Sequence, residues 1–241
     1  MRSERALIAA ALLAIAATAW VYLYFAGMGP ADGTAMAGMA MPAPSPLVTI
    51  STAFVMWSAM MTGMMLPSAL PMILVFAAIG ARRRARGERF VPTAVFTAGY
   101  LLVWAGFSLF AAVAQWPLGM AARVGPALGA VIVFAAGIYQ LTPLKTACLN
   151  HCRSPMQFLL TRWREGRAGA LRMGLEHGLY CLGCCWLLMA LLFVGGAMNL
   201  VWAAALAGLV LIEKLLPAGR WIARGSGLAL IGFGAYLLAA P

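Results

Sequence analysis

The sequence predicts an all-α fold, a polytopic bundle of six to seven transmembrane helices with its N-terminus in the cytoplasm. The chain of 241 residues is 64% hydrophobic and only 10% charged, which is typical of a membrane protein. Its apolar residues form uninterrupted runs that are long enough to cross the hydrocarbon core of a bilayer. Its basic residues cluster between those runs, as the positive-inside rule requires of cytoplasmic loops.

Seven candidate spans follow one another along the chain, and the last is short for a hydrocarbon core about 30 Å thick. With this order, every lysine and arginine except Arg123 falls on the cytoplasmic side. The formal net charge of +11 therefore indicates membrane topology, and we expect no binding of nucleic acid. The spans cover residues 6–26, 51–79, 92–114, 126–144, 171–194, 199–216 and 226–240.

Residues 1–26 are interpreted as a retained first transmembrane helix, because their apolar run is longer than that of a usual signal peptide. Residues 27–50 lack apolar periodicity and are predicted to form a flexible external loop rich in Met and Pro. Residues 51–241 are predicted to form a metal-binding bundle. The thioethers of the external loop either hold Cu(I) with low affinity or are incidental parts of a linker. They belong to Met36, Met39 and Met41.

The second span carries methionines on one half of its helical surface, and Pro67 and Pro71 remove two backbone donors near its middle. We select Met60 and Met64 as candidate ligands of a soft metal ion. Simple packing is the alternative, because methionine readily fills apolar cores. The third span is interpreted as scaffold, in which small residues such as Gly99 allow close helix contacts.

The fifth span gives the most specific chemical signal. Four potential metal ligands fall within an arc of about 120° on a helix, whereas Trp186 points the other way. Polar ligands at this depth in a membrane are costly and usually mark a functional site. Two neighbouring residues, Glu176 and Tyr180, are candidates for orienting the ligands or handling protons. The four candidate ligands are His177, Cys181, Cys184 and Cys185.

A second group of candidate ligands follows the fourth span. If the helix continues past Pro143, Cys148 and Cys152 lie on one face with His151 beside them. These residues form either half of a metal site or two small buried thiols next to a surface histidine.

The sixth span ends in two charged residues. Lys214 is expected to extend to the inner membrane surface, and Glu213 to face the bundle and support the metal ligands.

Three sequence blocks together resemble a bacterial family of predicted metal-binding integral membrane proteins of unknown function. They are Met-Trp-x-x-Met-Met-x-x-Met-Met-Leu-Pro at 56–67, Tyr-Gln-x-Thr-Pro-Leu-Lys-x-x-Cys-Leu-x-x-Cys-Arg at 139–153 and Gly-x-Tyr-Cys-Leu-Gly-Cys-Cys-Trp-x-Leu-Met at 178–189. The resemblance covers about residues 50–220. It implies a six- or seven-helix protein of the bacterial inner membrane with a bound metal.

The ligand types decide which metal the sequence predicts. Cysteine and histidine would also suit zinc, but the methionines favour Cu(I), so copper is the expected ion and zinc the alternative. We hypothesise that the protein binds Cu(I) for transport or delivery, with the lipid bilayer and a soluble metal-handling protein as partners. Two other hypotheses stay open at this point: a copper-dependent membrane oxidase or oxygenase, and a thiol–disulfide electron carrier.

Overall fold

The computed structural model describes residues 2–28, 45–118 and 123–239, and within these ranges the chain is helical without any β-strand. The all-α prediction is therefore confirmed. The first half contains α1 (Arg2–Met28), α2 (Pro46–Ala85), α3 (Thr93–Gln115), the short 3-10 helix η1 (Trp116–Leu118) and α4 (Pro126–Leu141). The second half contains α5 (Pro143–Arg153), α6 (Pro155–Arg162), α7 (Gly166–Ala190), α8 (Leu192–Gly195), α9 (Leu200–Leu215) and α10 (Gly219–Ala239).

Five helices in the described ranges are long and apolar enough to cross a membrane, or six if the bent pair α4–α5 counts as one span. The count of six agrees with the lower end of the six to seven spans that the sequence predicted. The remaining candidate, residues 199–216, corresponds to α9, which has only 16 residues. The last span is longer than expected, because α10 has 21 residues and begins at Gly219.

The expected fourth span is broken where Thr142 precedes Pro143. Thr142 is extended, with φ −70° and ψ 149°, because a following proline disfavours the helical conformation. The Thr142 hydroxyl accepts a hydrogen bond from the Lys145 N–H at 3.2 Å, and this cap starts α5. The axes of α4 and α5 consequently meet at a bend of 65°, which redirects the cysteines of α5.

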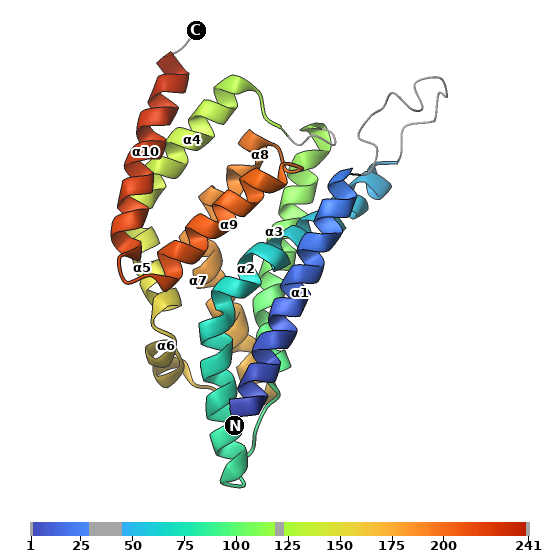
Figure 1. Ribbon diagram of the computed structural model, residues 1–241, viewed down its shortest axis with the longest axis vertical. Coiled ribbons are helices and arrows are strands. Elements are labelled where there is room, and N and C mark those ends of the chain that lie inside the picture. Colours follow the sequence, from blue (N-terminus) through green and yellow to red (C-terminus); the bar gives the residue numbers. More distant parts are fainter. Residues whose placement is uncertain (1, 29–44, 119–122, 240–241) are drawn as a thin grey trace.

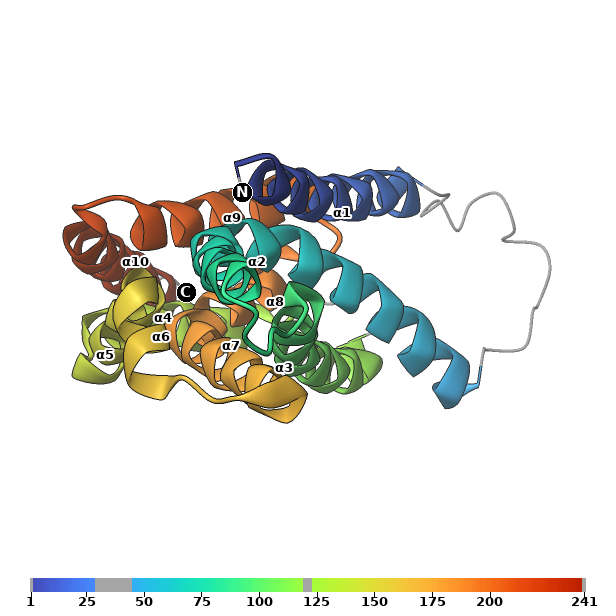
Figure 2. The same cartoon turned by 90° about the horizontal axis from the view of Figure 1, so that it is seen from below.

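The helices form two groups in Figure 1. On one side, α1 packs along α2 and α2 packs along α3, while α4 and α10 pair on the other side. Seen from below in Figure 2, α2 lies between α1 and the pair formed by α3 and α7. The N-terminus and the α2–α3 turn lie at the lower end of Figure 1, whereas α9 meets α10 at about half the height of the molecule.

The packed core lies along α2, where Trp57, Met61 and Met65 are fully buried. Large apolar side chains such as Leu7 and Val201 cover the outside and are mostly exposed. An apolar surface of this kind is consistent with contact with lipid.

Candidate metal centre

Close packing of α3 against α7 sets the position of the site. A Cβ atom at Gly99 would collide with the backbone oxygen of Leu171, and one at Gly174 would collide with the backbone oxygen of Phe96. Glycine at these positions lets the two backbones touch, which is how helices associate closely in lipid. The expected role of Gly99 is thus supported by the structure. The close contact brings Tyr100, the residue after Gly99, against the cysteines of α7.

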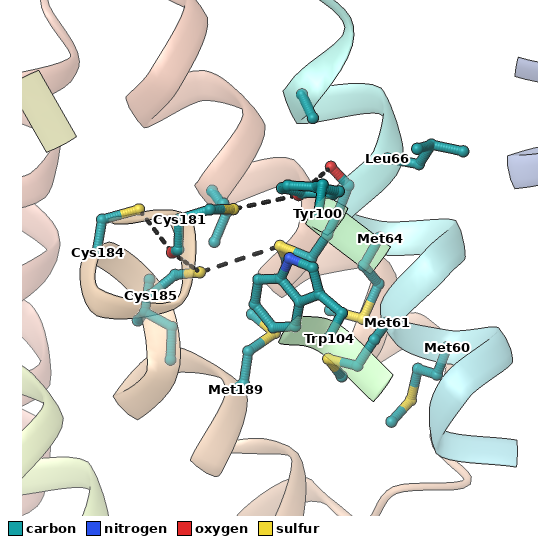
Figure 3. Packing of buried hydrophobic residues seen from close by; sticks show 14 of the residues in the cluster. Met60, Met61, Met64, Leu66, Tyr100, Trp104, Cys181, Cys184, Cys185 and Met189 are labelled. Atoms are coloured by element: carbon teal, nitrogen blue, oxygen red, sulfur yellow. Dashed lines mark hydrogen bonds between the residues drawn. The ribbon is translucent and has the colours of Figure 1, made fainter. Parts of the chain in front are cut away.

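The three cysteines of α7 share one buried face, as their helical spacing predicted. Cys181, Cys184 and Cys185 are all nearly inaccessible, while Trp186 is 44% exposed on the opposite side. The Cys184 and Cys185 thiols both donate to the Cys181 carbonyl oxygen, at 3.1 and 3.0 Å. Figure 3 shows the three side chains facing the methionines of α2 and the aromatic rings of α3. All five cysteines of the chain are free thiols.

A fourth thiol reaches this face from α5. Cys152 interacts with the side chains of Cys181 and Cys184, and it is only half-buried. Cys148 meets a different part of α7, since a Cβ atom at Gly183 would lie 2.9 Å from its Sγ. The structure therefore brings one of the two α5 cysteines into the cluster and leaves the other beside Gly183.

The two residues that were expected to work beside the thiols, His151 and Tyr180, stack on each other. Their ring centroids are 4.2 Å apart, and the angle between the two ring planes is 2°. The Nδ1 atom of His151 is 2.9 Å from the Ala147 carbonyl oxygen. This geometry gives His151 a stacking role next to the cluster, and its role as a ligand stays a prediction.

The thioether that meets the thiols belongs to Met65. Its Sδ lies 4.0 Å from the Cys185 Sγ, whereas Met60 and Met64, the methionines that the sequence analysis selected, are buried elsewhere along α2 (Figure 3). Met65 is held in place through its own carbonyl oxygen, which accepts hydrogen bonds from the Tyr100 hydroxyl at 3.0 Å and the Ser68 hydroxyl at 2.8 Å.

The methionine helix remains continuous through its prolines because a neighbouring helix replaces a lost hydrogen bond. Pro67 has no N–H for the carbonyl oxygen of Gly63, four residues earlier. The Trp20 indole N–H of α1 donates to that oxygen at 3.3 Å. Trp20 thus supplies the donor that Pro67 lacks at the Gly63 carbonyl oxygen.

Lys214 lies inside the bundle instead of at the membrane surface, which corrects the sequence prediction. Lys214 is only 6% exposed, because its side chain points from α9 toward α2 and α7. The ammonium Nζ is 2.9 Å from the Cys181 Sγ and 3.0 Å from the Ser68 Oγ. The Tyr100 hydroxyl lies 3.2 Å from the same sulfur. The Cys181 thiol is thus surrounded by polar groups from two further helices.

Glu213 is buried as expected, but it supports a separate polar group. Its carboxylate forms an ion pair with Lys145 at 2.7 Å, and both side chains are almost fully buried. The Gln140 amide donates to the Glu213 carboxylate and to the Ser226 hydroxyl, both at 2.8 Å, and its oxygen accepts a hydrogen bond from Lys145. Lys145 and Glu213 thus neutralise each other within this network, which includes no cysteine.

Glu176 and His177 are adjacent in the chain and point to different surroundings. The Glu176 carboxylate pairs with three arginines, at 3.4 to 3.6 Å, near the start of α7. His177 is 3% exposed, its ring stacks on Tyr100 with centroids 5.5 Å apart, and its Nδ1 has no hydrogen-bond partner. A buried imidazole nitrogen without a partner is costly, so it is available to a ligand. The three arginines are Arg162, Arg164 and Arg172.

The donor set fits a soft monovalent ion better than a caged divalent one. Within the described residues, no group of three or more His, Cys, Asp and Glu side chains is arranged as a metal cage. Among the sulfur atoms, the Cys152 thiol interacts with the Cys181 thiol. The thioether sulfur of Met65 contacts the thiol of Cys185. Thiolate and thioether ligands select Cu(I). The three loop methionines, Met36, Met39 and Met41, lie outside the described residues.

Two contributors to the site were missed by sequence reasoning. Tyr100 lay in a span that was interpreted as scaffold, although its place directly after Gly99 was a usable signal. Lys214 could not be found, because its contact with Cys181 joins residues 33 positions apart.

One family model matches the chain over residues 54–237, and its description is PpoB2, copper chaperone. The matched segment contains all the cysteines, the second-span methionines and Lys214. No curated protein and no solved structure matches the chain.

Proposed function

Because the chain belongs to this family of copper chaperones, we propose that it is an integral membrane protein that binds Cu(I) at the α5–α7 thiols and delivers it to a soluble metal-handling protein. The observation that carries the proposal is the cluster of sulfur atoms from three helices. Cys152 of α5 interacts with Cys181 and Cys184 of α7, and Met65 of α2 contacts Cys185, the next residue of α7. Copper is the cargo, and its release restores the free thiols.

The ligand chemistry supports copper over zinc. A zinc site would be expected to use four Cys, His or carboxylate ligands in a tetrahedron, whereas a thioether adds affinity for Cu(I). Burial of the cluster keeps water away from the bound ion. Cys152 is half-buried while the α7 thiols that it contacts, Cys181 and Cys184, are buried, so it is the thiol through which we expect copper to be handed on.

The protein purified in detergent and loaded with Cu(I) provides the test, with copper measured per folded chain. The Cys181→Ser/Cys184→Ser variant is expected to lose most of its copper, because two of the clustered sulfurs are replaced by weakly binding hydroxyl groups. Cys148→Ser is the matched control and is expected to keep its copper, since that thiol lies beside Gly183. Retention of copper by the double variant would disprove the assignment of the site.

A further inference from the structure

We propose that Lys214 balances the charge of the copper site and thereby sets the number of thiolates that bind Cu(I) at two. The inference rests on the proposed function, because it concerns the same sulfur cluster. The observation behind the inference is that the buried ammonium of Lys214 lies 2.9 Å from the Cys181 Sγ. A buried lysine requires a partner charge, because burial of an ammonium destabilises the fold unless an opposite charge lies beside it.

The partner charge of Lys214 has to come from sulfur. Among the ion pairs of the described residues, none joins Lys214 to a carboxylate. Its neighbour in the chain, Glu213, is paired with Lys145. The groups that Lys214 does contact are the Ser68 hydroxyl, which is neutral, and the Cys181 sulfur. Cysteine binds metal as the thiolate, so Cys181 is the contact that can carry the negative charge.

Counting charges then limits the ligands. A Cu(I) ion carries one positive charge, each thiolate carries one negative charge, and the Met65 thioether is neutral. Two thiolates and one Cu(I) ion leave a single negative charge, which the Lys214 ammonium cancels. One thiolate would leave an excess positive charge, and three would leave an excess negative charge. Because excess charge is costly in an apolar interior, the structure favours a site of two thiolates with a thioether, and Cys181 is one of the thiolates.

Removal of the ammonium tests this inference on the full chain in detergent. The Lys214→Leu variant is expected to bind Cu(I) about 100-fold more weakly, since breaking a buried charge pair has an effect of this size. Affinity is measured by competition with a chromogenic Cu(I) chelator, and folding by circular dichroism. The matched control, Lys145→Met/Glu213→Leu, removes the neighbouring ion pair as a neutral unit and is expected to leave the affinity unchanged.

A charge-restoring variant separates charge balance from a structural role. In Lys214→Leu/Cys181→Met, one thiolate and one Cu(I) ion are neutral without the lysine, so binding is expected to recover about tenfold relative to Lys214→Leu. X-ray absorption should then show sulfur ligands around Cu(I) in both the wild type and the double variant. A purely structural Lys214 predicts instead that the two losses add.

The outcomes are distinguishable from failure of the proposed function. Wild-type affinity in Lys214→Leu, with copper still lost from the cysteine double variant, would overturn only the role of Lys214. If Lys214→Leu does not fold, Lys214→Leu/Cys181→Met still decides the question, because it lacks both the ammonium and its partner. A folded double variant without copper would contradict charge balance, and one that binds copper would support it.

Discussion

The Cys181 sulfur contacts side chains from three other helices: Tyr100 of α3, Cys152 of α5 and Lys214 of α9. A cysteine that serves only packing behaves as a small apolar side chain and needs no polar neighbours. The Lys214 ammonium and the Tyr100 hydroxyl both approach this sulfur, and the buried ammonium would destabilise the fold if no negative charge lay beside it. These contacts make Cys181 the residue around which we expect copper to be held.

Met65 is predicted to be a copper ligand, and Met60 provides its control. Both side chains are fully buried on α2, so replacement of either by leucine is expected to cost less than about 1.5 kcal/mol of stability. Only Met65→Leu removes the sulfur that lies beside Cys185. We expect Met65→Leu to weaken Cu(I) binding about tenfold and Met60→Leu to leave it unchanged, as measured by chelator competition. A larger loss in Met60→Leu would favour the methionines selected from the sequence.

At the scale of elements, the contact between α3 and α7 positions Tyr100 against Cys181. It depends on glycines that leave no space for a side chain, as Gly174 does beside the backbone of Phe96. Gly106, on the same α3 helix, faces open space within 4 Å. All the small residues of this span were expected to allow close helix contacts. In the structure Gly99 makes such a contact, whereas Gly106 does not.

Alanine substitutions at Gly174 and Gly106 are expected to change the stability of the protein in opposite directions. Gly174→Ala must push α3 and α7 apart and is expected to destabilise the protein by about 1–3 kcal/mol. Gly106→Ala meets no neighbour and is expected to be neutral or to stabilise the helix by up to about 1 kcal/mol. Thermal unfolding in detergent measures both. Equal melting temperatures for the two variants would show that the close contact does not limit stability.

For the whole molecule, the two buried lysines change the basis of the topology prediction. Lys145 and Lys214 were counted among the basic residues of the inner surface, yet both lie inside the bundle. The arginines at the end of α2 remain as the main positive charge near the N-terminus, because the α2–α3 turn and the N-terminus lie at the same end (Figure 1). The predicted orientation therefore now depends chiefly on that end of the molecule.

Labelling of single introduced cysteines tests the orientation. Ser45 and Arg84 lie near opposite ends of α2, whose 40 residues are longer than a bilayer core is thick, at about 1.5 Å per residue. Ser45→Cys is expected to react with an impermeant thiol reagent from outside the cell, and Arg84→Cys only after the membrane is opened. The unsubstituted chain, in which Cys148 and Cys152 are only partly buried, measures the background labelling. Reaction of both positions from the same side would contradict the topology.

The sequence alone determined the local features of this protein. Uninterrupted apolar runs predicted the helices, because backbone groups in lipid must be satisfied within the segment. The spacing of Cys181, Cys184 and Cys185 predicted their shared face, because helix geometry fixes the direction of each side chain. Pro143 was a local signal for the boundary between α4 and α5, although the predicted fourth span continued to residue 144.

The tertiary structure decided which of these faces meet. Met65 rather than Met60 reaches the thiols, Tyr100 joins the site from a helix with no predicted chemistry, and Lys214 turns inward to Cys181. Each contact depends on how far two helices approach and how they are rotated, which is set by packing between residues distant in the chain. Helical spacing carries no information about that rotation. The sequence therefore predicted which residue types bind the metal and which helix face carries them. The side chains that contact these ligands were visible only in the folded bundle.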